Sequence, residues 1–316
     1  MSYAFDPELL PLVEMLTPGD FRDVAASRAG LAALIAPMNA HVDTSGTTIE
    51  DREVPGRDGD PPVPVRVYTP SGAAPAGGRP ALLDIHGGGF VVGDMDMEHA
   101  IAAAITRELG AVVVVVDYRL APEHPFPAGV EDCYAALTWL HAESAALGVD
   151  PARIAVGGQS AGGGLSAATA LLARDRGGPP LCFQFLGIPE LDDRLETASM
   201  QAFVDTPMWN RPNAVMSWRY YLGDPAPIEI PIYAAPARAA DLVGLPPAYV
   251  STMEFDPLRD EGILYAARML AAGVKVELHS YPGTFHGSSV VPTAEVSKRM
   301  AAEQLDVLRR ALAPKG

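Results

Sequence analysis

Short apolar runs alternate with longer stretches of helical character from about Val63 onward. Val112 to Val116 is an uninterrupted apolar run, which is typical of a strand buried on both faces of a parallel sheet. Other runs of strand character are Val63–Tyr68, Pro80–Ile85, Arg153–Gly157, Leu181–Phe185, Pro247–Met253 and Val274–Ser280. Between the first two of these, Ser71 to Gly78 is rich in Gly, Pro and Ala and predicts a flexible, hairpin-like connection. The alternation predicts an α/β fold with a mostly parallel central sheet and helices on both faces.

Two regions do not follow this alternation. Residues 1 to about 45 have the apolar pattern of helices, and a stretch from about 190 to 223 interrupts the alternation between two core strands. The second stretch is rich in large apolar side chains, namely Phe203, Met208, Trp209, Met216 and Trp218. We therefore expect a main domain over residues 46–316, preceded by N-terminal helices in 1–45 and interrupted by an insertion at about 190–223. The helices in these regions either cover a site or pack elsewhere on the core.

Composition limits the classes of partner. The 316-residue chain is long enough to bury a large core, and its formal net charge of −16 argues against binding to nucleic acid or anionic membranes. The stretch Met1 to Pro7 has neither the basic region nor the apolar stretch of a secretory signal, so we expect a cytoplasmic protein. Cys133 falls on a predicted helix and Cys182 in an apolar strand, and both are expected to be buried thiols without a disulfide.

The first chemical motif is the pentapeptide Gly158 to Gly162, with Ser160 at its centre. It follows a short apolar strand and precedes a helix of small residues, which is the setting of a nucleophile elbow. Glycine is needed on both flanks because the tight turn leaves no room for side chains there. The sequence therefore predicts Ser160 as a nucleophile. The alternative is a glycine-rich turn without chemical function.

A second motif, His86 to Phe90, follows another predicted strand and contains three consecutive glycines. Backbone amides in such a loop can stabilise the oxyanion that forms during acyl transfer. We predict the amides of Gly88, Gly89 and Ala161 as these donors, and we expect His86 to fix the loop rather than act as a base. The glycine-rich stretches lack both the Lys-Ser/Thr ending of a P-loop and the spacing of a dinucleotide site, which argues against nucleotide binding.

A base and an acid are expected late in the chain, in the order serine, acid, histidine. Apolar and polar residues alternate along the predicted strand, which puts His279 on the same solvated face as Lys275 and Glu277, whereas His286 follows a turn beyond the end of that strand. The sequence therefore favours His286 as the base. Asp256 follows a predicted strand directly and is preferred as the orienting acid to Glu254, which lies nearer the strand.

These motifs, taken in order, resemble those of one enzyme family. The motifs are His86–Phe90, Tyr118–Ala128, Gly158–Gly162, Asp256–Glu261 and His286–Gly287. They look like those of the hormone-sensitive-lipase-like carboxylesterases, also called bacterial family IV. The resemblance implies an α/β-hydrolase fold and a triad of Ser160, Asp256 and His286. It further implies a small-molecule ester substrate and no metal or organic cofactor.

The resemblance has further implications and two exceptions. The N-terminal helices and the insertion are expected to form a cap over the site, and acyl chains of about four to eight carbons are expected to fit below it. Members of the family often form homodimers through the last strand, here around Val274 to Leu278. Gln159 replaces the usual aspartate before the serine, and Ser288 replaces a common phenylalanine after His-Gly. An amidase or deacetylase on the same triad, and a non-catalytic receptor of the same fold, are the alternative functions.

Overall fold

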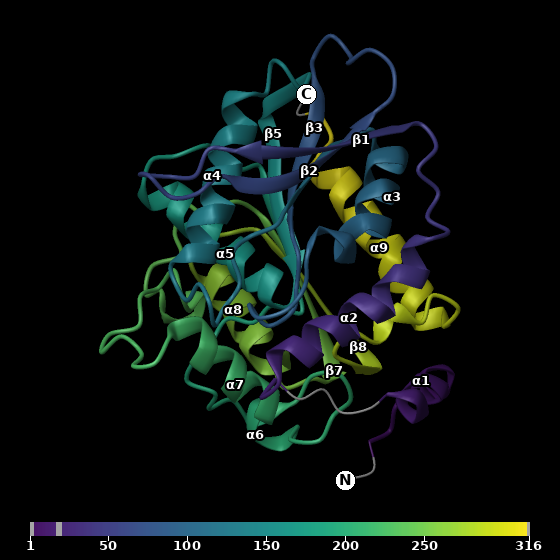
Figure 1. Ribbon diagram of the computed structural model, residues 1–316, viewed down its shortest axis with the longest axis vertical. Coiled ribbons are helices and arrows are strands. Elements are labelled where there is room, and N and C mark those ends of the chain that lie inside the picture. Colours follow the sequence, from purple (N-terminus) through teal and green to yellow (C-terminus); the bar gives the residue numbers. More distant parts are fainter. Residues whose placement is uncertain (1–2, 17–20, 315–316) are drawn as a thin grey trace.

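A single eight-stranded sheet organises the chain (Figure 1). The computed structural model describes residues 3–16 and 21–314, so residues 17–20 of the predicted N-terminal helices lie outside the described residues. The strand order is β1-β2-β4-β3-β5-β6-β7-β8, in which β2 runs antiparallel to both its neighbours and all other pairs are parallel. The strands are β1 Thr47–Val54, β2 Val63–Pro70, β3 Arg79–Ile85, β4 Val112–Val116, β5 Val149–Gln159, β6 Phe183–Gly187, β7 Ala248–Phe255 and β8 Val276–Phe285. The predicted α/β-hydrolase fold is confirmed.

Helices cover both faces of the sheet and gather at one end of it (Figure 1). One face is covered by α3 (His99–Leu109) and α9 (Glu295–Ala311). The other face is covered by α4 (Ala128–Ala142), α5 (Ala161–Asp175) and α8 (Arg259–Ala271). The remaining helices lie together at one end of the sheet, as Figure 1 shows: α1 (Leu10–Met15), α2 (Val24–Asn39), α6 (Ala198–Ala202) and α7 (Arg211–Leu222). Within the described residues, four short 3-10 helices lie among these elements, at Pro7–Leu9, Met95–Glu98, Pro236–Arg238 and Ser288–Val290.

The five valines of β4 explain why its apolar run is continuous. Every one of them is fully buried, because β4 lies inside the sheet between β2 and β3. Val113 and Val115 pack with α3 and α9, whereas Val112, Val114 and Val116 pack with the helices on the opposite face. Side chains alternate along a strand, so a strand covered on both faces needs an apolar residue at every position.

The connection Ser71 to Gly78 is not a hairpin. β2 pairs with β4 rather than with β3, and β3 lies beyond β4 in the sheet. The prediction of a hairpin-like connection was therefore wrong, because turn residues indicate a flexible connection without specifying which strands pair.

The last strand is longer than predicted. β8 continues through Pro282 and Gly283, which we expected to form a turn, and ends at Phe285. β8 is the edge strand of the sheet, where a proline removes no inter-strand hydrogen bond on the open side. Gly283 is held on two sides, since its amide donates to Glu254 and its carbonyl accepts from the amide of Asp6.

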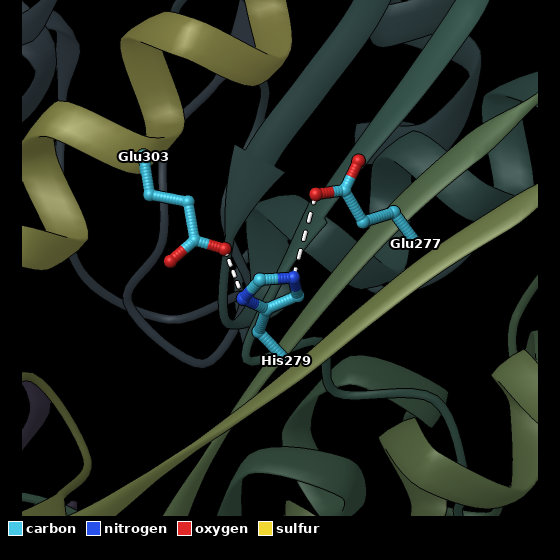
Figure 2. A group of neighbouring side chains, drawn as sticks. All are labelled: Glu277, His279 and Glu303. Carbon is cyan, nitrogen blue, oxygen red and sulfur yellow. Dashed lines mark ion pairs between the residues drawn. The ribbon is translucent and has the colours of Figure 1, made fainter.

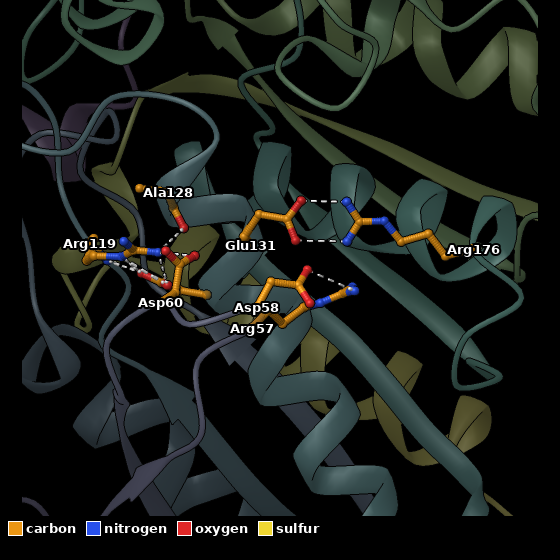
Figure 3. Close-up of polar contacts among 8 residues, drawn as sticks. Arg57, Asp58, Asp60, Arg119, Ala128, Glu131 and Arg176 are labelled. Carbon is orange, nitrogen blue, oxygen red and sulfur yellow. Dashed lines mark hydrogen bonds and ion pairs between the residues drawn. The ribbon is translucent and has the colours of Figure 1, made fainter.

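A network of arginines connects the loop between β1 and β2 to α4 and α5 (Figure 3). Arg119 donates to both carboxylate oxygens of Asp132 on α4 and also to Asp60 of the loop. Glu131 of α4 pairs with Arg176 at the end of α5. These contacts fix the segment that follows β4, and with it the predicted Tyr118–Ala128 motif, against the helix layer.

Two further features concern the cysteines and the helices. Cys133 and Cys182 are buried and neither is part of a disulfide, as predicted. Over the described ranges 3–16 and 21–314, no helix combines the length and the apolar character that crossing a bilayer requires.

Candidate active site

Ser160 lies in a strained turn between β5 and α5. Its φ of 57° and ψ of −122° are rarely adopted by a residue with a side chain, and such strain is typical of a functional position. A methyl group at Gly158 would lie 2.2 Å from the carbonyl oxygen of Ile85, and one at Gly162 would lie 1.9 Å from the same atom. Both glycines are therefore required because the turn packs directly against the end of β3. This is the nucleophile-elbow geometry that the sequence predicted.

His286 connects Ser160 to Asp256. Its Nε2 lies 2.9 Å from Ser160 Oγ, and its Nδ1 lies 2.7 Å from Asp256 Oδ2. Asp256 follows β7, and its second oxygen accepts a hydrogen bond of 2.9 Å from the amide of Leu258. With Nδ1 donating to the carboxylate, Nε2 is free to accept the serine proton. The three side chains are buried and form the arrangement of a Ser-His-Asp triad.

Glu254 and His279, the alternatives to Asp256 and His286, make other interactions. Glu254 accepts a hydrogen bond from the amide of Gly283 on β8, an interaction that ties two neighbouring strands together. His279 projects from β8 between Glu277 and Glu303 of α9, so that a carboxylate faces each of its ring nitrogens (Figure 2). It makes no contact with Ser160 or Asp256, and the preference for His286 is consistent with this placement.

Glu277, His279 and Glu303 form the one group of three potential metal ligands found in the described parts of the chain. Their surroundings satisfy them without an ion. Arg310 pairs with Glu277, and the hydroxyl of Tyr281 donates to Glu303 at 2.6 Å. Because the two carboxylates face different nitrogens of one ring, the group is better described as an ion-pair network on the surface of β8 than as a metal centre.

The glycine loop after β3 lies next to the elbow. Gly88 and Gly89 have φ values of 108° and 56°, and the carbonyl of Gly88 accepts from the amides of Val91 and Val92. No backbone carbonyl within residues 3–16 and 21–314 accepts from the amides of Gly88 or Gly89. A methyl group at Gly87 would lie 3.5 Å from Ser160 Cβ, which places the loop beside the nucleophile.

His86 belongs to the support of this loop. Its ring is fully buried, stacks on Tyr118 with centroids 4.2 Å apart, and directs Nδ1 at the carbonyl of Gly87 at 2.7 Å. Burial lowers the pKa of His86 to about 4, so the imidazole is neutral near pH 7 and donates from Nδ1. The expected structural role of His86 is supported. Glu98 lies below the same loop, and burial raises its pKa to about 7.

The N-terminal segment and the insertion at about 190–223 both contact the site. The indole of Trp209, from the insertion, lies 5.7 Å from the His286 ring between centroids and 5.4 Å from the ring of Phe21. A methyl group at Gly89 would lie 2.6 Å from Trp209 and 2.9 Å from Phe21. One large apolar side chain of the insertion, Trp209, thus packs against both the glycine loop and the histidine.

A cavity of about 890 Å³ lies between the N-terminal segment and the insertion. Its apolar lining comes from Val13, Leu16, Val204, Met208, Val215 and Met216. None of Ser160, Asp256 or His286 lines it directly. Met208 lies between this cavity and the site. It lines the cavity, and a methyl group at Gly287, next to His286, would lie 2.9 Å from Met208 Cε.

The two exceptions to the family pattern are accommodated locally. The side chain of Gln159 lies over Gly187, where a methyl group would be 1.9 Å from its Oε1. Ser288 is buried with its hydroxyl toward the sulfur of Met253 at 3.7 Å. Neither side chain takes part in the hydrogen bonds of Ser160, His286 and Asp256.

Two residues near the site were not predicted from the sequence. The hydroxyl of Ser217, on α7, lies 2.8 Å from the carbonyl oxygen of Gly89 and 3.2 Å from Oε1 of Glu190. No motif or spacing distinguishes either residue. Only the three-dimensional structure reveals this contact, since 128 positions separate Ser217 from Gly89 in the chain.

Known proteins resemble the chain over nearly its whole length. A family model described as the alpha/beta hydrolase fold matches residues 82–289. Carboxylesterase NlhH of Mycobacterium tuberculosis is 42% identical over 322 aligned residues, which cover 97% of each chain. The structure titled "Bacterial Heroin Esterase" is 56% identical, covers 98% of this chain and 99% of its own, and superposes with a TM-score of 0.96. The esterase LipW from Mycobacterium marinum is 37% identical, covers 98% and 97% of the two chains, and has a TM-score of 0.89.

The sequence motifs, the sheet order, the Ser160–His286–Asp256 contacts and these relatives agree with one another. The chain therefore belongs to the hormone-sensitive-lipase-like family of α/β hydrolases, and it is a carboxylic ester hydrolase.

Proposed function

We propose that Ser160 is the nucleophile, His286 the general base and Asp256 the residue that orients the histidine. The pair of hydrogen bonds made by His286, to Ser160 and to Asp256, is the observation that carries this proposal. His286 removes the serine proton as Ser160 Oγ attacks the ester carbonyl, and Asp256 stabilises the imidazolium. His286 then protonates the departing alcohol, leaving an acyl group on Ser160. Water, deprotonated by the same histidine, attacks this acyl-enzyme and releases the acid.

The amides of Gly88, Gly89 and Ala161 are the proposed oxyanion hole. Gly88 and Gly89 lie in the loop beside Ser160, and Ala161 begins α5 directly after it. Ala161 also lies at the positive end of the α5 dipole, which favours negative charge near its amide. These donors stabilise the charge that develops on the carbonyl oxygen in the transition state.

A phosphonate ester that modifies nucleophilic serines tests the assignment. Ser160 Oγ displaces the leaving group at phosphorus, and peptide mapping should locate one adduct, on the peptide that contains Ser160. Ser166, also buried but donating to the carbonyl of Gly162 on its own helix, should stay unmodified and serves as the internal control. An adduct on another residue, with full loss of activity, would contradict the assignment of the nucleophile.

We further propose that the N-terminal helices and the insertion at about 190–223 form a cap. The contacts of Phe21 and Trp209 with the glycine loop support it, as does Arg28 of α2, which donates to the carbonyls of Val91 and Ala121. The cavity beyond Met208 then offers an apolar but limited space for the acyl chain. The substrates of this proposal are esters of short-to-medium acyl chains, of about four to eight carbons.

A series of p-nitrophenyl esters from acetate to palmitate tests the proposed chain length. Each methylene that enters a dry apolar cavity gains about 0.8 kcal/mol, so kcat/KM should rise with length and fall once the cavity is full. Rates should also remain smooth across the solubility limit of each ester. A maximum at palmitate, or a jump in rate when the ester forms micelles, would contradict it.

A homodimer through β8 is the remaining proposal. β8 is an edge strand, and Leu278 on it is 37% exposed. Light scattering on the purified protein should give twice the mass of one chain, and Leu278→Pro should give the monomer. A monomer at all protein concentrations would argue against it.

A further inference from the structure

The glycine loop is anchored to the insertion through one side chain. The carbonyl of Gly88 accepts from backbone amides of its own loop, and that of Phe90 accepts from the amide of Ala121 at 2.9 Å. The carbonyl of Gly89, between them, instead accepts from the hydroxyl of Ser217 at 2.8 Å. The middle residue of the loop is therefore held by α7 rather than by the core domain.

Glu190 connects this anchor to the nucleophile elbow. Its amide donates to the carbonyl of Ser160 at 3.0 Å, and its carboxyl Oε1 lies 3.2 Å from the hydroxyl of Ser217. Glu190 and Ser217 are both fully buried. One continuous path of contacts thus runs from the elbow through Glu190 and Ser217 to Gly89.

The number of protons determines the direction of these hydrogen bonds. A serine hydroxyl has one proton, and both neighbours of Ser217 are oxygen atoms. Ser217 can donate to Gly89 and still be hydrogen-bonded to Glu190 only when the carboxyl of Glu190 is protonated and donates to Ser217 Oγ. Burial, opposed in part by the contact with Ser217, raises the pKa of Glu190 to about 8, which is consistent with a protonated acid near pH 7.

The ionisable groups around Glu190 favour the same state. Asp256 after β7 and Glu261 of α8 interact with it electrostatically, as do the hydroxyls of Tyr118 and of Tyr221 on α7. All of these groups are neutral or negative, so none stabilises a second charge at Glu190. The neutral acid is the form that fits this environment.

We propose that Glu190 and Ser217 are positioning residues, which hold Gly89 from the insertion so that the loop presents its amides to the oxyanion. This inference rests on the oxyanion role proposed above for Gly88 and Gly89. It makes the insertion part of the catalytic geometry, in addition to its contacts with the cavity.

The first test compares Ser217→Ala with Ser144→Ala. Ser144 is also buried and donates to a helix carbonyl, that of Leu140, but it lies at the end of α4. Ser217→Ala should lower kcat about tenfold, less than the 10²–10³ expected for loss of an oxyanion donor, with KM changed less than about twofold. Ser144→Ala should leave both constants at the parent values.

A transition-state analogue separates positioning from general damage. The Ser160 hydroxyl adds to the carbonyl carbon of a trifluoromethyl ketone and its proton passes to His286, which leaves an oxyanion in the hole. The inhibition constant of this ketone should rise about tenfold in Ser217→Ala, in parallel with the loss in kcat/KM. A purely structural defect would not produce this parallel.

The second test uses Glu190→Gln, whose amide can donate to Ser217 but does not titrate. In the parent, kcat should decline above pH of about 8, because ionised Glu190 then attracts the Ser217 proton away from Gly89. Glu190→Gln should keep kcat at pH 7 within about threefold and remain flat up to pH of about 9.5. This variant also decides the question if Ser217→Ala does not fold.

Either of two results would overturn the inference: parent kcat in folded Ser217→Ala, or the same alkaline decline in Glu190→Gln as in the parent. Ser160→Ala, measured alongside, distinguishes failure of the positioning role from failure of the proposed function. An active Ser160→Ala would overturn the proposed function itself. An inactive Ser160→Ala beside an unaffected Ser217→Ala would overturn only the positioning role.

Discussion

Trp209 lies beside His286, with ring centroids 5.7 Å apart and ring planes inclined by 33°. The indole is also the nearest group to any side chain added at Gly89. One side chain of the insertion thus borders both the proposed base and the proposed oxyanion loop.

Trp209→Ala should shift the preference toward longer acyl chains. Removal of the indole opens space beside Gly89, and each methylene that occupies it gains about 0.8 kcal/mol, or roughly fourfold in kcat/KM. The ratio of kcat/KM for octanoate to that for butyrate should therefore rise relative to the parent. Trp209→Phe, which keeps an aromatic ring, is the control and should show a smaller shift. An unchanged ratio in both variants would place the acyl chain elsewhere.

His286→Ala should abolish activity, whereas His279→Ala should not. By analogy with serine proteases, loss of the base costs about 10⁶ in kcat. His279 contacts only the carboxylates of Glu277 and Glu303 on the surface of β8, so its removal should leave kcat within about twofold. Single-turnover and steady-state rates with p-nitrophenyl butyrate check both variants. The reverse pattern would show that the base is misassigned.

Asp256→Asn should lower kcat by about 10⁴ while leaving KM nearly unchanged, because the amide favours the wrong tautomer of His286. The carboxylate of Asp256 also accepts from the amide of Leu258, and an asparagine oxygen can still do so. Circular dichroism and thermal unfolding should thus resemble those of the parent. Glu254→Gln, two residues earlier on β7 and hydrogen-bonded to Gly283, is the matched control and should stay active.

The sequence predicted the positions of candidate site residues best where these residues directly follow a core strand. Ser160, Asp256 and the loop from His86 each follow a core strand directly, and the carboxyl ends of parallel strands meet at one edge of a sheet, so the predicted parallel sheet was enough to place them together. His286 was also expected beyond the end of the last strand, where it lies, although β8 runs further than its alternating pattern indicated. Gly158 and Gly162 could be predicted because the close approach to β3 admits no other residue.

The contacts of the insertion could not be predicted in the same way. Ser217 lies on a helix that begins at Arg211, and its partner Gly89 lies 128 positions earlier in the chain. No hydrophobic period relates the two, and a serine on a helix is ordinary in composition. The pairing of β2 with β4 was missed for a similar reason, because strand order depends on how whole layers pack.

Two glycines of the proposed oxyanion loop, Gly88 and Gly89, should respond differently to alanine. A methyl group at Gly88 would lie 2.0 Å from the carbonyl oxygen of Val92, so the loop backbone itself must move. Gly88→Ala should therefore lower kcat by about 10²–10³. A methyl group at Gly89 would instead meet the rings of Trp209 and Phe21, and Gly89→Ala should chiefly raise KM. Measurement of kcat and KM for both variants checks the contrast, and equal effects would contradict it.

The free energy of unfolding should fall as pH rises from about 6.5 to about 8, and Glu190→Gln should reduce this slope. Burial raises the folded pKa of Glu190 from 4.5 to about 8, so the folded state binds a proton that the unfolded state has already released. Each group with a pKa raised in this way lowers the free energy of unfolding by about 1.4 kcal/mol per pH unit in this window. The lowered pKa of His86 makes the free energy of unfolding rise with pH instead, but only at lower pH, between about 4 and 6.5.

Urea unfolding of parent and Glu190→Gln at several pH values checks this expectation. Other buried acids, such as Asp84 and Glu261, contribute to the slope in both proteins and cancel in the comparison. Parallel curves for the two proteins would show that Glu190 is not protonated in the folded state.

The chain enters the insertion after β6 and leaves it before β7, two strands that remain neighbours in the sheet. The insertion can therefore be replaced without altering the sheet. It is the place to introduce a segment from another enzyme when the substrate range is to be changed. The bond from Ser217 to Gly89 sets a condition on any such chimera. If Ser217 holds the loop as proposed, a transplanted insertion must bring its own hydroxyl or amide donor to that carbonyl, because the recipient would otherwise acquire a new pocket and lose turnover.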